Sequence, residues 1–485
     1  MRKIDLLSVA GFCVLLLSCV AFGQGDDADT LSDSSNHSTA TESPKSSGAQ
    51  SNIMDRIKIS GWGGIEFGQI MHGLYFNTPL DHKWQECFRS RLDLTASVND
   101  RLTINVGTEI WYQYSTLQTA TNGPSYLPGV NVIIDEADLT YNPLRGNFPV
   151  AIQAGYFKFK YNAEATNLGE YLFRSGCYPT FVTNNFDFPM SRLLGLNVEN
   201  TLFKDNSLFS FHQNLLLTSE TELYPYEDIS LSYLPSVSIW KNAFTVGGGI
   251  CGQRMFSVDE KSTTPHDSKT IAEIKNIRPV ADSNNVPIPG DTTGDTAFYS
   301  FAGTKVMAHA TFDPKPFIPS DIFGPEDLKL YGEIAILGLK NYPIYQASSA
   351  RYDLLSERMP FMVGFNFPTF KFLDVLSLEW EYFKNRYYGS YFNQTEGSQG
   401  VRLPLPLNQA IADRPGMDSL SWHHNVKWSV YAKKSIGRNV QIVAQVAKDH
   451  RHAFINLSDP RYGDFGDNLT NPNDWYYYIK LAYGF

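Results

Sequence analysis

The chain has 485 residues, a net charge of −10, 14% aromatic side chains and only 19% charged ones. A mean hydropathy of −0.26 excludes a bundle of transmembrane helices, which would show repeated apolar runs of about 20 residues. The acidic balance argues against a nucleic-acid partner, because such proteins need a basic surface that neutralises phosphates. Many aromatic residues without long apolar runs are typical of one large β-barrel.

Residues 1–23 have the features of a secretory signal peptide. Arg2 and Lys3 precede an apolar stretch, and small residues at positions 21 and 23 form the cleavage pattern. The sequence before Cys19 weakly resembles a lipoprotein cleavage box, but Leu17 is bulky where such boxes carry a small residue. We therefore expect cleavage after residue 23, with lipidation at Cys19 as the open alternative.

Residues 24–54 consist mainly of Ser, Thr, Asp, Asn and Gly, with few large apolar side chains. Such a segment cannot bury enough apolar surface to offset the entropy lost on ordering. We expect a disordered periplasmic tail there and a single barrel domain over residues 55–485.

From residue 57 onward, apolar and polar side chains alternate with a period of two, as they do on strands with one buried face. This alternation predicts about 16 strands, most of them near or above the roughly 9 to 11 residues that a tilted strand needs to cross a bilayer. They are expected at 57–70, 85–98, 101–115, 130–142, 148–158, 190–202, 206–217, 228–240, 242–254, 297–312, 327–338, 358–368, 373–386, 423–433, 438–450 and 474–485.

Every second connection between these strands is short, except for the longer, proline-rich segment 313–326, and the others are long and polar. The long ones are expected at 71–84, 116–129, 159–189, 218–227, 255–296, 339–357, 387–422 and 451–473. Short turns on one side and long loops on the other are typical of outer-membrane barrels. The sequence predicts an all-β, transmembrane, antiparallel up-and-down β-barrel with short periplasmic turns, long extracellular loops and both termini in the periplasm.

The C-terminal segment has an alternating apolar face that includes Tyr483 and ends on Phe485. This ending resembles the last strand of Gram-negative outer-membrane proteins. Together with the leader and the loop asymmetry, it makes residues 55–485 similar to the porin superfamily, without a named subfamily. The resemblance implies a location in the Gram-negative outer membrane, lipid contact, and recognition of Tyr483 and Phe485 by the barrel-assembly machinery.

Alternation also assigns charged side chains to the inner face of the barrel. The predicted basic pore-lining residues are Lys58, Arg89, Arg91, Lys427 and Lys480. The predicted acidic ones are Glu66, Glu109, Glu136, Asp138, Glu199, Glu333, Glu379 and Glu381. Most of the two sets fall on different strands, so we expect separated basic and acidic arcs and a transverse field across the lumen.

The loop after the fifth strand, residues 160–189, is the candidate for narrowing the lumen. Its aromatic content is high for a solvated loop, which indicates that it packs against another part of the protein. The charged constriction candidates on it are Glu164, Glu170, Arg174 and Asp187. Packing over the outer rim or against a neighbouring subunit is the alternative.

A barrel of about 16 strands leaves an aqueous channel. We therefore predict a porin for passive diffusion of small hydrophilic solutes and ions. The alternatives are a surface-exposed adhesion or structural barrel with a closed lumen, and a sugar-selective channel suggested by Tyr387 and Tyr388 beside Arg386. A homotrimer and a bridge between Cys87 and Cys177 are left open.

No catalytic motif is recognised, so we expect no enzymatic activity and no cofactor. Two histidines, His450 and His452, share a strand end, but a metal site is not favoured.

Overall fold

The structure, a computed structural model, describes residues 56–75, 78–79, 81–115, 130–144, 149–173, 191–203, 208–219, 228–256, 270–281, 287–300, 303–318, 321–339, 355–383, 426–449, 469 and 473–485. The predicted leader, the tail and much of the long loops lie outside these residues. No described helix is long and apolar enough to cross a bilayer.

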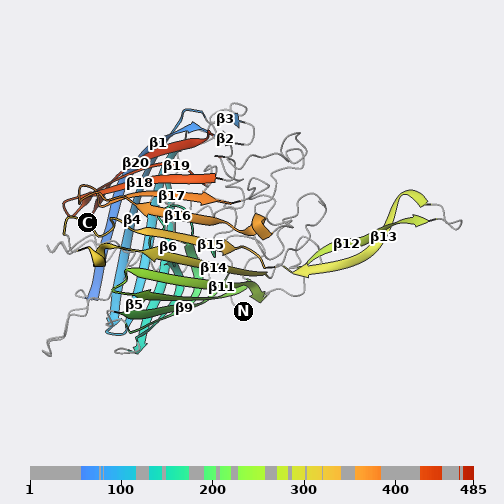
Figure 1. Cartoon of the computed structure of the whole chain (residues 1–485), viewed down its shortest axis with the longest axis horizontal. Coiled ribbons are helices and arrows are strands. Elements are labelled where there is room, and N and C mark those ends of the chain that lie inside the picture. The colour runs from blue at the N-terminus through green and yellow to red at the C-terminus, as the bar shows by residue number, and fades with distance from the viewer. Residues whose placement is uncertain are drawn as a thin grey trace.

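Sixteen antiparallel strands form one closed barrel (Figure 1). They are β1 (Ile57–His72), β4 (Lys83–Asn99), β5 (Leu102–Ser115), β6 (Val130–Leu144), β7 (Val150–Phe159), β8 (Ser191–Leu202), β9 (Phe209–Ser219), β10 (Ile229–Ile239), β11 (Phe244–Phe256), β14 (Gly303–Phe312), β15 (Leu330–Ile336), β16 (Phe361–Asn366), β17 (Val375–Tyr382), β18 (Val426–Ile436), β19 (Val440–Lys448) and β20 (Trp475–Gly484). Each strand falls on one of the predicted segments, so the predicted fold is confirmed.

The barrel closes where the last strand pairs with the first. Glu66 of β1 lies opposite Lys480 of β20, and Gly61 exchanges two backbone hydrogen bonds of 2.9 and 3.1 Å with Phe485. A Cβ atom on Gly61 would lie 2.9 Å from the Phe485 ring, so the close approach needs glycine here. With this pairing neither end strand keeps an unpaired edge. A β-sheet must be closed in this way to span the hydrocarbon region of a membrane.

The two faces of the barrel differ as alternation predicts. In β1, Ile65 and Phe67 are 57% and 39% exposed, whereas Glu66 between them is 6% exposed. The same contrast occurs in β17, where Leu378 and Trp380 are exposed and Glu379 is buried. Exposed apolar side chains therefore cover the outside, where they suit lipid, and charged side chains point into the lumen.

A second sheet stands apart from the barrel wall. Strands β12 (Thr270–Ala281) and β13 (Pro287–Ser300) pair only with each other and project as a long hairpin beyond the end opposite the C-terminus (Figure 1). The predicted strand 297–312 is wrong at its start, because residues 297–300 pair with β12 and β14 begins at Gly303. Alternation alone could not separate the two strands, since it continues across the short break.

Two short strands and two short helices complete the described structure. Strands β2 (Leu74–Tyr75) and β3 (Thr78–Pro79) form a two-stranded sheet in the first long loop. The short helices η2 (Lys315–Phe317) and η3 (Leu355–Arg358) lie in connections on either side of β15. We call the barrel end with residues 99–102, 240–243, 313–329 and 367–374 the short-turn end, and the opposite end the long-loop end.

The loop that crosses the lumen

Residues 160–173 leave the end of β7 and reach the opposite wall of the barrel. In the ring of sixteen strands, β7 and β17 have seven strands between them on either side, so they face each other across the lumen. The backbone amides of Asn167 and Leu168 nevertheless both lie 2.8 Å from Oε2 of Glu379 on β17. The segment therefore spans the lumen; its packing over the outer rim is excluded for these residues.

Glu379 and Glu333 are the main anchors of this crossing loop, by which we mean residues 160–173. Glu379 also accepts hydrogen bonds from the Thr166 amide and from the Tyr331 hydroxyl, at 3.0 Å for the latter. Each carboxylate is 4% exposed or less. Buried charges of this kind persist in proteins where hydrogen bonds satisfy them.

Glu333 on β15 makes a second set of hydrogen bonds to the same loop. It accepts from the amides of Glu170 and Tyr171 at 3.0 and 2.8 Å, from the Asn162 side chain at 3.0 Å and from the Tyr161 hydroxyl. Burial and the negative charge of Glu333 raise the pKa of Tyr161 well above its ordinary value, so this hydroxyl stays protonated and can donate. The loop is thereby held at two neighbouring points of the far wall.

Three further contacts fix the remainder of the crossing loop. The Tyr171 hydroxyl donates to Glu381 at 2.6 Å, and the Asn167 side chain donates to Asp449 at 2.6 Å. At the short-turn end, the Glu164 carboxylate lies 3.0 Å from the Lys329 ammonium. Burial alone would lower the pKa of Lys329, but the charges of Glu164 and Glu326 raise it, so the ion pair is maintained.

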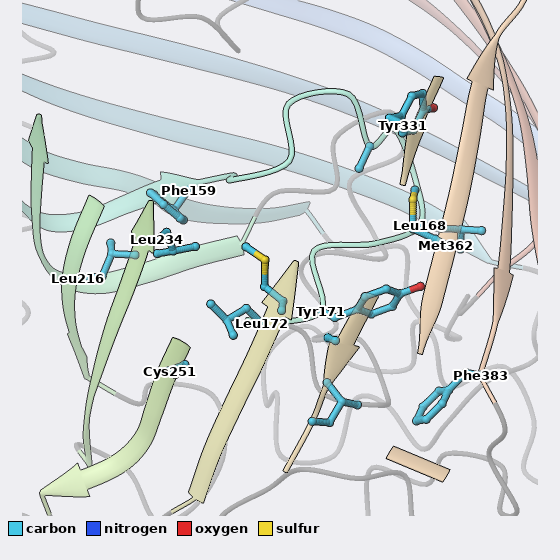
Figure 2. Close-up of a cluster of buried hydrophobic side chains, with 14 of the residues drawn as sticks. Phe159, Leu168, Tyr171, Leu172, Leu216, Leu234, Cys251, Tyr331, Met362 and Phe383 are labelled. Carbon is cyan, nitrogen blue, oxygen red and sulfur yellow. The ribbon is translucent and has the colours of Figure 1, made fainter. Parts of the chain in front are cut away.

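An apolar cluster fills the space between the crossing loop and the wall from β7 to β17 (Figure 2). Leu168 and Leu172 of the loop are 0% and 1% exposed and pack with inward side chains of the wall. The wall contributes Phe157, Phe159, Leu216, Leu234, Cys251, Met307, Tyr331, Ala335, Leu337, Met362 and Phe383. On this side of the lumen, buried apolar side chains therefore join the crossing loop to the wall.

Glycines in β11 make room for this packing. A Cβ atom on Gly247 would lie 2.1 Å from Nε2 of His309 on β14, and one on Gly249 would lie 3.1 Å from Leu172 of the loop. Two glycines of the run of three, Gly247 and Gly249, therefore serve close packing within the strand.

The adjoining wall, from β4 to β8, carries a network of ion pairs. Arg91 of β4 is within hydrogen-bond distance of Asp93, at 2.6 Å, of Glu136, at 2.6 Å, and of Asp135. Asp135 also pairs with Lys158 at 2.7 Å and with Arg192 at 3.6 Å, and Arg192 pairs with Glu109 at 3.2 Å. Three basic and four acidic groups are thus interleaved on one surface.

A second charged group lies next to the closure of the barrel. Glu66 of β1 is 3.7 Å from Arg89 and 4.0 Å from Lys480, and the Lys480 ammonium lies 4.0 Å above the Trp62 ring. The predicted separation into basic and acidic arcs is therefore wrong. Alternation assigned each side chain to a face but could not show that opposite charges on neighbouring strands meet.

The other predicted site residues have several different environments. Lys58 is exposed near the short-turn end, and Glu199 is 3.9 Å from His212. Asp138 accepts from Asn105 and Gln153 at 3.3 and 3.2 Å. The Lys427 ammonium donates to the carbonyls of Asp449 and Leu469. Glu170 accepts from the amide of Asn162 at 2.6 Å, which folds the crossing loop on itself.

The remaining predictions lie partly outside the described residues. The residues outside the described ranges are Arg174, Asp187, Cys177, Arg386, Tyr387, Tyr388, His450 and His452. Among the described residues Cys87 and Cys251 form no disulfide, and Tyr483 and Phe485 are exposed near the C-terminus. No group of three or more described His, Cys, Asp or Glu side chains could hold a metal ion.

Sequence reasoning missed Asp135, Lys158 and Arg192, which are central to the ion-pair network. The pairing of β5 with β6 shifts between Gly107 and Thr108, which leaves Asp135 outside the regular register. A bulge of this kind changes which residues face inward, and strict alternation cannot anticipate it. The inward position of Asp135, on which the network depends, therefore became visible only in the structure.

No protein-family model and no curated protein sequence matches the chain. Among solved structures, the chain is similar to Salmonella typhi OmpF in complex with daunomycin, with a TM-score of 0.42, 10% identity, and coverage of 88% of this chain and 97% of that one. A triple mutant of the Rhodopseudomonas blastica porin matches with a TM-score of 0.37, 7% identity, and coverage of 88% and 100%. The fold itself is shown by the strand order of this chain: it is a closed barrel of sixteen antiparallel strands, the architecture of membrane porins.

Proposed function

We propose that the protein is an outer-membrane porin that passes small hydrophilic solutes and ions through the half of its lumen next to β1, β4–β6 and β18–β20. The observation that carries this proposal is the unequal division of the lumen by the crossing loop. On one side lies an apolar cluster, and on the other lie the ion pairs of Arg91 and of Glu66. Polar solutes and water favour the charged side.

The interleaved charges favour dipolar and zwitterionic solutes over simple cations or simple anions. Because Arg91 faces three carboxylates, its charge is compensated locally, so the channel is expected to have a weak ion preference. No enzymatic activity and no cofactor are part of this proposal. The solute class, a trimeric state and recognition of Phe485 by the assembly machinery belong to it only as expectations.

A closed barrel that acts through its external surface is the second candidate. It is favoured by the low exposure of inward charged groups, such as 3% for Arg89 and 2% for Lys480, and by the projecting β12–β13 hairpin. An adhesion or structural role would use that hairpin and the long loops.

Single-channel recording separates the two candidates. The purified, refolded protein is placed in a planar bilayer, and conductance and reversal potential are measured under a salt gradient. Stable conductance steps with a weak ion preference support the porin. A folded, heat-modifiable barrel that never conducts refutes it and directs attention to the hairpin.

A further inference from the structure

A row of exposed apolar side chains covers three neighbouring connections at the short-turn end. Residues 240–243, 313–329 and 367–374 connect β10 to β11, β14 to β15 and β16 to β17, and these strands are adjacent in the barrel. The row, which we call the rim shelf, consists of Trp240, Phe317, Ile318, Ile322, Phe370 and Phe372, with exposed fractions from 37% to 78%. Such a patch on a folded surface indicates a contact with something else.

The rim shelf is held in place by specific contacts between the turns. Trp240 packs edge to face on Phe317 with ring centroids 6.3 Å apart, and Phe370 stacks on Phe323 at 5.7 Å. Asp327 links the second turn to the third, because it accepts hydrogen bonds from the Thr369 hydroxyl and the Phe370 amide. The exposed rings therefore form one surface across three turns.

The backbone of two of these turns is strained. Trp240 and Lys241 have φ values of 53° and 56°, and Phe370 and Lys371 have 53° and 65°. Bulky residues are rarely found in this left-handed region, and such strain is typical of functional segments. Its effect here is the same in both turns: an exposed aromatic ring is placed next to an exposed lysine.

The rim shelf continues into the lipid-facing surface of the barrel. Phe312, Leu330 and Phe367 lie at the short-turn ends of β14, β15 and β16 and are 41%, 46% and 40% exposed. An occupant that covers the shelf therefore also borders the membrane. This continuity favours a lipid over a soluble protein.

The charges near the shelf favour an anionic lipid. Neither Lys241 nor Lys371 has an ion pair in the part of the chain that the structure describes. The nearby carboxylates are mostly occupied: Asp313 pairs with Lys315 at 2.9 Å, Glu326 with Lys329 at 2.7 Å and Asp374 with Lys434 at 3.8 Å, whereas Asp321 is exposed. Two ammonium groups are thus available to a phosphate beside rings suited to a membrane interface.

We propose that the rim shelf binds anionic phospholipid from the leaflet at the short-turn side. The phosphodiester contacts Lys241 or Lys371, and the acyl chains pack on Trp240, Phe317 and Phe370. This inference rests on the outward surface, so it is independent of whether the lumen conducts.

Native mass spectrometry of the delipidated, folded protein tests the proposal. Phosphatidylglycerol and phosphatidylethanolamine with the same acyl chains are titrated separately into the wild type and the variants. Lys241→Gln and Lys371→Gln are each expected to weaken phosphatidylglycerol binding about fivefold, which corresponds to ~1 kcal/mol per basic side chain near an anionic surface. Trp240→Ala is expected to weaken binding of both lipids.

Lys83→Gln, which removes an exposed lysine near the opposite end of the barrel, is the matched control and is expected to leave both affinities unchanged. Lys241→Arg and Lys371→Arg are expected to retain the preference for phosphatidylglycerol. Equal wild-type binding of the two lipids overturns the proposal, as does an unchanged preference in the double Gln variant. An equal loss in Lys83→Gln also overturns it, because a general effect of charge then explains the binding.

Discussion

Replacement of Glu379 by Gln tests the crossing loop directly. The carboxylate accepts three backbone amides, from Thr166, Asn167 and Leu168, together with the Tyr331 hydroxyl, and it is 1% exposed. An amide side chain has a single acceptor oxygen, so the two donors on one carboxylate oxygen lose their partner. At about 1–3 kcal/mol for each buried unsatisfied group, the bound position of the loop loses roughly 2–6 kcal/mol.

We expect this loss to act on the loop and to leave the sixteen-stranded wall intact. The assay is single-channel recording in a planar bilayer, with heat-modifiability on a gel as the measure of folding. Glu379→Gln should increase conductance and current noise, because the loop leaves the far wall more often. Adding Glu333→Gln should increase both further, because Glu333 holds the same loop.

Glu199→Gln is the matched control. It removes the same charge from the inner face, but among the described residues Glu199 pairs with His212 and forms no hydrogen bond or ion pair with the crossing loop. If Glu379→Gln and Glu199→Gln conduct alike, the loop does not depend on its carboxylate anchors and the reasoning is refuted.

Three further predictions concern charge, acidity and packing. Neutralising Arg89 and Arg91 together should shift the reversal potential toward cation selectivity, because Asp93, Asp135 and Glu136 remain; an unchanged potential would remove both arginines from the solute path. Burial alone would raise the pKa of Asp327, but hydrogen bonds from Gly324, Thr369 and Phe370 lower it below its ordinary value. The ionised Asp327 therefore stabilises the folded protein above the unfolded pKa of about 3.9, and this stabilisation is lost as the pH falls through the lower, folded pKa. In unfolding experiments the wild type should therefore exceed Asp327→Asn in stability at pH 6, and a gap that stays constant to pH 2 would contradict this. Gly247→Ala should destabilise the barrel by about 1–3 kcal/mol through its clash with His309, whereas Gly248→Ala, whose Cβ atom would meet only Met307 O at 3.5 Å, should be tolerated; equal thermal unfolding of the two variants would argue against the packing account.

The wall of the barrel was predictable because alternation and turn length are local signals. The alternation around Ile65 and Glu66 is enough to assign one side chain to the outer face and the other to the inner face. The short turn at Asn99 can be predicted from the turn residues themselves. The inward position of the crossing loop was suggested by its aromatic content, but its partners were not. Glu379 and Glu333 were assigned to the pore lining, whereas they bind loop amides more than 160 positions away in sequence.

Features that depend on register or on distant contacts were beyond the sequence pattern. The β-bulge that turns Asp135 toward the ion-pair network shifts the register of β5 and β6 by one residue, and no residue type in the sequence predicts this shift. The β12–β13 hairpin was hidden for a similar reason, because its second strand continues the alternation of β14. The rim shelf depends on turns that are neighbours only once the ring has closed.

The span of the crossing loop also has a consequence for the order of assembly. The Thr166 amide and its acceptor on Glu379 are 213 residues apart, so the loop cannot gain this anchor until β17 has joined the wall. During that interval its amides remain hydrated, and the apolar side chains of Leu168 and Leu172 lack most of their partners. Contacts this distant in sequence form slowly. We therefore expect the lumen to be divided only after β7 and β17 have both joined the wall.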